Sequence, residues 1–102
     1  MTIIFDHTFS EIEPEIIYDL LRLRSEIFVV EQSSLYLDLD GCDTNPLTRH
    51  IWINGPNGPI SYLRVLSEPE GVRIGRVATR KESRGQGVAT ELLRYVVDSI
   101  KR

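Results

Sequence analysis

The stretch that most constrains the fold is residues 72–93, which reads as a strand, a glycine-containing turn and a helix. Val72, Ile74 and Val77 favour a strand that ends shortly before the turn. After the turn, apolar residues recur with the 3.6-residue period of one helix face. These residues are Val88, Ala89, Leu92, Leu93, Val96, Val97 and Ile100. We therefore predict a strand, a turn and then an amphipathic helix that carries this apolar face.

The turn between them is Arg84-Gly85-Gln86-Gly87. Its two glycines can adopt positive φ and allow a ligand to approach the backbone closely. The first amides of a helix have no internal partner, and the helix dipole attracts anions to that end. Arg84 adds a mobile positive charge, so the turn predicts a phosphate or pyrophosphate site. The alternative is a strand-to-helix turn that binds nothing.

Length and composition predict one small domain over residues 1–102. The net charge of −3 provides no basic field that would recruit nucleic acid. No apolar run approaches the roughly 20 residues of a membrane span, and the first residues do not resemble a signal peptide. The single cysteine, Cys42, cannot form an internal disulfide or a zinc site by itself. These features favour a cytoplasmic protein.

Further strands are predicted at residues 2–9, 50–54 and 60–66. The glycine- and proline-rich segment 55–59 makes the second and third of these an antiparallel hairpin. His50 begins a strand, and we interpret it as a structural residue rather than a catalyst.

A first helix opens near Pro14, which suits the first helical position, with Ser10, Ile12 or Glu13 as rival caps. It carries an apolar stripe formed by Ile16, Ile17, Leu20, Leu21, Leu23, Ile27 and Phe28. We place Arg22, Arg24 and Glu26 on its outer side. We expect the helix to end near Val29 or Val30, where β-branched residues accumulate.

Asp38, Asp40 and Asp43 follow this helix in a loop. They do not fit a calcium loop, because the positions that require glycine and glutamate hold Asp43 and Arg49. We interpret the loop as a solvated turn whose aspartates cap backbone amides.

Arg64 and Arg76 lie in otherwise apolar strands and need partners if they are buried. Asp38, Asp40 or Glu31 are the predicted partners. A site for a substrate anion is the alternative that we favour less.

Two sets of residues carry a family resemblance. Arg84-x-x-Gly87-x-Ala89 resembles the acyl-CoA pyrophosphate loop of the GNAT N-acetyltransferases, whose pattern is Gln/Arg-x-x-Gly-x-Gly/Ala. Residues 21–32, which contain Phe-Val-Val-Glu-Gln, and 36–41 are similar to the ElaA-like branch of that family. Strands around His50, Arg64 and Arg76 look like the same branch, so the resemblance covers nearly the whole chain.

The resemblance implies an α/β (α+β) fold: the N-terminal portion of the acyl-CoA N-acyltransferase (GNAT) fold. The expected structure is a mainly antiparallel four-stranded sheet with flanking helices, in the order β-α-β-β-β-α. GNAT domains continue with further strands and a fourth helix, so we expect residues 1–102 to form an incomplete domain. Three explanations of this incomplete domain are open. The chain is a truncated form, it is completed by another chain, or it is a working half-domain. An exposed edge on the fourth strand predicts a homodimer.

The resemblance also implies an acetyl-CoA-dependent N-acetyltransferase that moves an acetyl group to a primary amine by direct attack, without a metal. The implied cofactor-binding residues are Val77, Ala78, Thr79, Arg84, Gly85, Gln86, Gly87, Val88 and Ala89. Many relatives use a glutamate on the fourth strand as a base, but this strand has none, so Glu31 is the candidate base. Tyr36 is expected to line the acceptor pocket.

The acceptor is a small amine, an amino acid, a peptide N-terminus or a lysine, and the activity of the short chain is left open. The alternative function is a non-catalytic CoA-binding or interaction module. A nucleotide-binding turn fits poorly, because the chain has no Gly-Lys-Ser/Thr motif.

Overall fold

The protein is described by a computed structural model over residues 2–101. Four strands form one sheet in the order β1-β2-β3-β4, and each neighbouring pair is antiparallel. The strands are β1 (Phe5–His7), β2 (Arg49–Gly55), β3 (Gly58–Glu68) and β4 (Gly71–Thr79). The predicted hairpin between β2 and β3 is confirmed.

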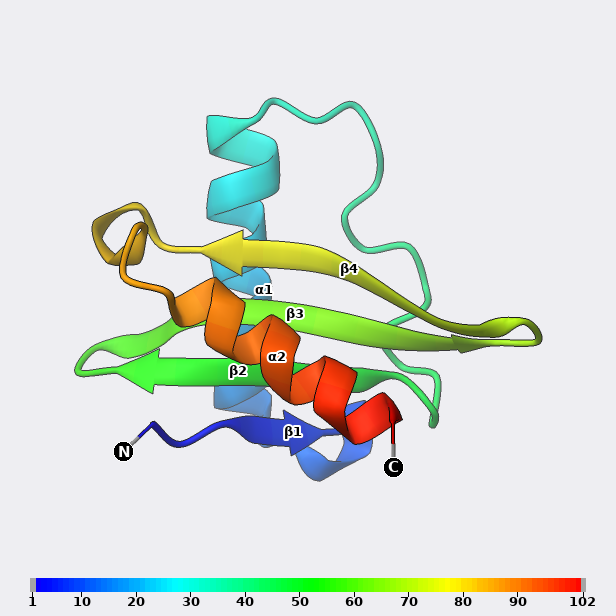
Figure 1. The fold of residues 1–102 in the computed structure, drawn as a ribbon. Helices are drawn as coiled ribbons and strands as arrows, with labels where there is room; N and C mark the ends of the chain where they lie inside the picture. The colour runs from blue at the N-terminus through cyan, green and yellow to red at the C-terminus, as the bar shows by residue number, and fades with distance from the viewer. Residues whose placement is uncertain (1, 102) are drawn as a thin grey trace.

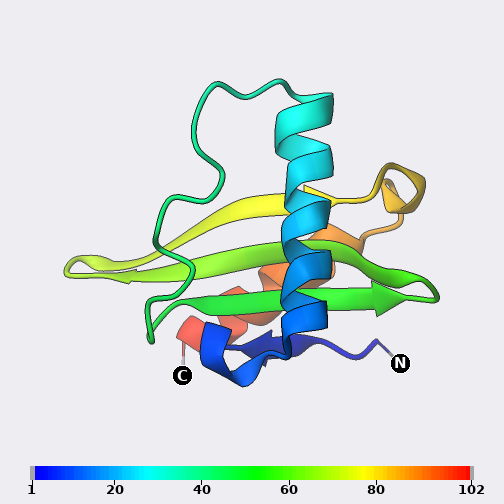
Figure 2. The same cartoon turned by 180° about the vertical axis from the view of Figure 1, so that it is seen from behind.

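Two long helices flank the sheet, one on each face (Figures 1 and 2). Helix α1 (Pro14–Arg24) continues into a π-helical segment, η2 (Ser25–Glu31), and α2 (Val88–Ile100) follows β4. Short 3₁₀ turns lie at η1 (Phe9–Glu11) and η3 (Lys81–Ser83). The α+β fold and the element order predicted from the sequence are confirmed.

Side-chain alternation along the central strands divides the core into two layers. On β2, Trp52 packs with α1 and η2 residues, whereas its neighbours Ile51 and Ile53 pack with Leu92 and Val96 of α2. Both faces of β2 and β3 are therefore buried, and their polar side chains on the α1 face are buried with them.

The first strand is shorter than the predicted 2–9, because Phe9 begins a 3₁₀ turn. The Thr8 amide and hydroxyl donate to Glu11 Oε1 at 2.8 and 3.1 Å. This local capping interaction ends the strand. Helix α1 starts as one of the alternatives predicted, with Glu13 as its N-cap and Pro14 at its first position.

The first helix was predicted to end near Val29 or Val30, and it ends one residue later, with a π-helical last segment. It continues through η2 to Glu31, where the Gln32 amide donates to the Ile27 carbonyl at 3.0 Å. Burial of Ile27 and Phe28 keeps this segment against the core and overrides the weak helix propensity of the valines. A π-helical turn is uncommon and is often found beside a functional site.

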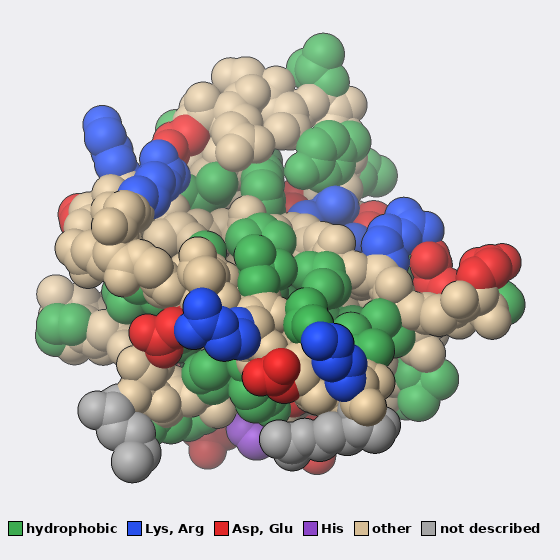
Figure 3. All heavy atoms as spheres, in the orientation of Figure 1, with side chains coloured by type: hydrophobic (Ala, Val, Ile, Leu, Met, Phe, Trp, Pro, Cys, Tyr) green, Lys and Arg blue, Asp and Glu red, His purple; other side chains and the backbone are tan. Residues whose placement is uncertain are grey.

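The apolar stripe of α2 is wider than the part of the helix that packs against the sheet. Leu92 and Val96 are fully buried, whereas Leu93, Val97 and Ile100 are each about 40% exposed. Figure 3 shows hydrophobic side chains gathered on the face that carries α2. Within residues 2–101 we find no helix that is both long and apolar enough to cross a membrane.

Candidate functional site

The glycine turn connects the end of β4 to the first residue of α2. Gly85 and Gly87 adopt φ of 81° and 78°, and Gly87 is the N-cap of α2. A Cβ built on either glycine would meet no atom within 4 Å. Glycine is needed there for backbone conformation, since the space above the turn is open.

The amides of this turn have no partners. Six consecutive N–H groups, from Gly85 to Thr90, make no hydrogen bond within residues 2–101. The first bond of the helix runs from the Glu91 amide to the Gly87 carbonyl at 3.0 Å. Free amides at a helix N-terminus after left-handed residues form a concave anion-binding site. The predicted pyrophosphate cradle therefore has the donors that a pyrophosphate needs.

A surface concavity of about 210 Å³ lies over these amides. Its lining residues are Thr79, Ser83, Arg84, Gly85, Gly87, Val88, Ala89 and Thr90. Most of the predicted cofactor-binding residues thus meet at one place. Gln86 is directed away, since its side-chain amide donates weakly to the Glu82 carbonyl at 3.4 Å. Ala78 is buried in β4, and Val77 is partly exposed beside it.

Arg84 is held at the rim of this concavity. Its Nε donates to the Thr79 carbonyl at 3.0 Å, and its Nη2 donates to both carboxylate oxygens of Glu31 at 2.8 and 3.0 Å. Glu31 comes from the end of η2, 53 positions earlier in the chain. The structure therefore places the proposed base against the proposed phosphate loop, a contact that the sequence did not predict.

Strand β4 contains a bulge close to its middle. Tyr62 on β3 faces Ala78 and Arg64 faces Gly75, so two residues of β4 oppose one residue of β3. Arg76 occupies the bulge with a φ of 53°, which is rare for a residue other than glycine. The outer edge of β4 has no neighbouring strand within residues 2–101, so the bulge lies on an open edge.

The loop after η2 is tied to this bulge. Arg76 Nη2 donates to the carbonyls of Leu37 and Asp38 at 3.2 and 3.1 Å, and its Nε lies 3.0 Å from Asp38 Oδ1. The Tyr36 ring stacks on the guanidinium, with its centroid 4.8 Å from Arg76 Cζ. Tyr36 is half exposed beside the bulge.

A buried ion-pair cluster lies under this loop, on the α1 face of the sheet. Arg24 is fully buried, and its Nη1 donates to Asp43 Oδ1 at 2.7 Å. Arg64 donates to the same oxygen at 3.0 Å and also pairs with Asp40. Arg24 Nε lies 3.2 Å from Asp38 Oδ2. The structural partners predicted for Arg64 and Arg76 are confirmed for Asp38 and Asp40.

Two predictions about this cluster were wrong. Arg24 is not on the outer side of the helix, and Asp38 and Asp43 are buried rather than solvated. Among the described residues 2–101, Asp40 is the one of the three that caps an amide as predicted, accepting from the Cys42 N–H at 3.1 Å. Burial opposes the charge on Asp43, but the hydrogen bonds from the arginines outweigh it and lower the pKa of Asp43. The hydrogen bond from Arg64 lowers the pKa of Asp40 well below its usual range.

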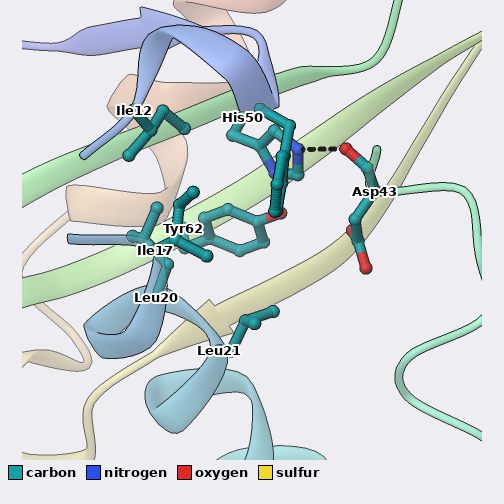
Figure 4. Close-up of a pocket in the computed structure, with 8 residues that line it drawn as sticks. Ile12, Ile17, Leu20, Leu21, Asp43, His50 and Tyr62 are labelled. Carbon is teal, nitrogen blue, oxygen red and sulfur yellow. Dashed lines mark hydrogen bonds between the residues drawn. The ribbon is translucent and has the colours of Figure 1, made fainter. Parts of the chain in front are cut away.

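His50 and Tyr62 extend the cluster beside a small cavity of about 10 Å³, whose lining Figure 4 shows. His50 Nε2 lies 3.0 Å from the Asp43 carbonyl, which only accepts, so Nε2 carries the proton. His50 Nδ1 then accepts from the Tyr62 hydroxyl at 2.7 Å. Burial lowers the pKa of His50 and raises that of Tyr62. His50 is structural, as predicted.

A signal for Arg24 was present in the sequence. It stands four residues after Leu20 and three before Ile27, on the apolar stripe itself. A charged residue at such a position requires a buried counter-charge. For the Arg84–Glu31 pair we find no comparable local signal.

No group of three or more His, Cys, Asp or Glu side chains within residues 2–101 is arranged to hold a metal ion. The aspartates of the loop are instead paired with guanidinium groups.

Comparison with known proteins identifies the family. Residues 15–102 match the model of the acetyltransferase (GNAT) family. The chain belongs to this family. The glycine turn, with its free amides, is at the position where the sequence resemblance places the acyl-CoA pyrophosphate loop, and the family implies an acyl-CoA co-substrate.

Two curated relatives place the chain in the ElaA-like branch of the GNAT family. UPF0039 protein Rv2851c of Mycobacterium tuberculosis is 42% identical over 89 residues, which are 82% of this chain and 57% of the relative. Protein ElaA of Escherichia coli is 37% identical over 95 residues, which are 88% of this chain and 61% of ElaA. The chain thus spans less than two thirds of the length of these relatives.

Solved structures agree with this placement. The crystal structure of Escherichia coli ElaA superposes with a TM-score of 0.89 at 33% identity, covering 98% of this chain and 70% of ElaA. An acyl-CoA N-acyltransferase from Pseudomonas aeruginosa superposes with a TM-score of 0.87 at 30% identity, covering 97% of this chain and 70% of that one.

Proposed function

We propose that this GNAT chain acts as an acetyl-CoA-dependent N-acetyltransferase toward a primary amine. The observation that carries the proposal is the run of six amides at the start of α2 that have no partner within residues 2–101, beneath an open concavity. Such a site is suited to an anion such as a phosphate or pyrophosphate.

The residues of the turn and of β4 are proposed to bind different parts of the co-substrate. The amides from Gly85 to Ala89 would hold the pyrophosphate, and Arg84 would add charge-assisted hydrogen bonds. Val77, Ala78 and Thr79 would offer the open β4 edge to the pantetheine arm. The bulge at Arg76 redirects the amides of this edge, which makes β4 the proposed source of oxyanion donors.

Acyl transfer forms a bond from the amine nitrogen to the acyl carbon and breaks the bond from that carbon to sulfur. One proton must leave the amine nitrogen, and the thiolate must finally receive one. Glu31 is the proposed acceptor of the amine proton, once its contact with Arg84 opens. Tyr36, stacked on Arg76 beside the bulge, is proposed to line the acceptor side.

A non-catalytic CoA-binding module is the second candidate. It is favoured by the engagement of both Glu31 oxygens with Arg84, which leaves the proposed base occupied in the free protein. The two candidates differ in turnover and not in CoA binding.

The unpaired β4 edge also supports a proposed homodimer, since such edges readily add a second strand. A monomer in light scattering at high protein concentration would contradict it. A cytoplasmic location remains a prediction from the sequence.

The decisive test is calorimetric titration with acetyl-CoA. The affinities of the wild-type chain, Gly87→Glu and Gly41→Glu are compared. Gly41 has a similar φ of 85° and equally open surroundings, so it controls for backbone strain. We expect Gly87→Glu to abolish binding and Gly41→Glu to retain it. Equal affinity of Gly87→Glu and wild type would refute the site.

If acetyl-CoA binds, thiol release in the presence of small amines, amino acids, peptides and lysine then tests catalysis. Amine-dependent release supports the transferase, whereas binding without release across these acceptors supports the non-catalytic module.

A further inference from the structure

We propose that Arg84 exchanges partners, pairing with Glu31 in the free protein and with the phosphate of the co-substrate when it binds. Glu31 is then a positioning residue that competes with the ligand for one guanidinium. This inference rests on the proposed CoA site and adds a device that controls access to it.

The contacts of Arg84 are compatible with this exchange of partners. Its Nε is anchored on the Thr79 carbonyl, which keeps the guanidinium at the rim of the concavity. Its Nη2 is occupied by Glu31, and its Nη1 has no partner within residues 2–101. A phosphate on the free amides would therefore find one guanidinium nitrogen available and the other held by a carboxylate.

The Glu31–Arg84 pair is weak enough to be exchanged. The two side chains are 37% and 43% exposed, and solvent screening makes exposed ion pairs of this kind weak. A phosphate supported by helix amides offers the same guanidinium a stronger, bidentate partner. The fully buried Arg24, by contrast, has no comparable freedom to exchange.

The exchange has a direct consequence for the carboxylate. When Arg84 turns to the phosphate, both Glu31 oxygens lose their partner and become free to accept a proton. Arrival of the co-substrate would thus be coupled to release of the group proposed as the base, because a phosphate that binds both terminal nitrogens of Arg84 needs the one that Glu31 occupies.

The test is a comparison of dissociation constants at pH 7.5 for CoA, ADP and pantetheine. CoA and ADP carry the pyrophosphate, and pantetheine does not. Glu31→Gln removes the competing charge. Glu26→Gln is the matched control, because Glu26 also lies on η2, is similarly exposed, and pairs with Arg80 at 3.4 Å outside the concavity.

We expect Glu31→Gln to tighten CoA and ADP about three- to fivefold. Pantetheine binding and the Glu26→Gln control should remain unchanged. In an Arg84→Ala background, the effect of Glu31→Gln should disappear, because the competition acts through Arg84.

Unchanged or weaker CoA binding by Glu31→Gln would overturn the inference, and so would an equal tightening in the Arg84→Ala background. Neither result would affect the proposed function. If wild-type protein bound neither CoA nor ADP, the proposed function would fail, and the exchange would fail with it.

Discussion

Two regions of this molecule join arginines to carboxylates, and they differ in what surrounds the pair. Around Arg24 and Arg64, three aspartates and a tyrosine occupy the guanidinium groups in a buried cluster. At Arg84 the pair is exposed and lies beside six amides that have no partner in the described part of the chain, residues 2–101. Buried pairs lose much when one partner is removed, whereas exposed pairs can be exchanged for a ligand. The first region therefore maintains the fold, and the second is suited to binding.

The largest effect that would test this contrast is loss of stability in Asp43→Ala. The change leaves Arg24 and Arg64 without their shared acceptor, and breaking a buried pair in this way costs about 3–5 kcal/mol. Urea denaturation followed by circular dichroism measures it, with Glu31→Gln as the exposed counterpart, for which we expect about 1 kcal/mol or less. Equal losses in both variants would contradict the division into two regions.

The next effect is on ligand affinity. Arg84→Ala should weaken CoA binding about tenfold or more, since a hydrogen bond between charged groups contributes about 1.5–3 kcal/mol. Its unfolding midpoint should stay close to that of wild type. Arg80→Ala is the comparison, because Arg80 pairs with the same helical segment but does not line the concavity. Calorimetry that finds both variants equally impaired would remove the special role of Arg84.

A smaller effect is expected from pH, and it separates the buried region from the exposed one. Burial lowers the pKa of His50 from 6.5, so the unfolded state binds this proton first and stability falls as pH drops below about 6.5. Asp43, whose pKa is also lowered, adds a further loss below about pH 4 as its unfolded form becomes protonated.

Urea midpoints measured from pH 8 to pH 3 follow both losses. In His50→Gln the slope between pH 6.5 and 5 should flatten, whatever the absolute stability of the variant. A slope identical to that of wild type would show that His50 does not titrate on unfolding.

The smallest effect concerns an exposed pair with no ligand site beside it. Arg73 pairs with Glu68 at the β3–β4 turn, and both lie near the surface. We expect Arg73→Ala to leave the urea midpoint and CoA affinity unchanged within error, because solvent replaces the interaction. A CoA affinity reduced as much as in Arg84→Ala would mean that general surface charge, rather than the position of Arg84, governs binding.

Several features of the protein were determined by the sequence alone. Apolar periodicity predicted both helices, turn residues predicted the hairpin, and Gly85 and Gly87 predicted a left-handed turn before α2. These signals are local, since they depend on the φ preferences and spacing of residues close together in the chain. The family resemblance rests on the same short segments.

Other features were decided only by the tertiary structure. Arg24 meets Asp43 across 19 positions, and Arg84 meets Glu31 across 53. The bulge at Arg76 and the extension of the first helix to Glu31 depend on contacts with a loop and a core assembled from distant segments. The sequence around a charged residue does not indicate which residue it will pair with. The partner depends on which distant segments the packed sheet brings together. The sequence therefore predicted a candidate anion site, and the tertiary structure brought the Glu31 carboxylate to the arginine beside it.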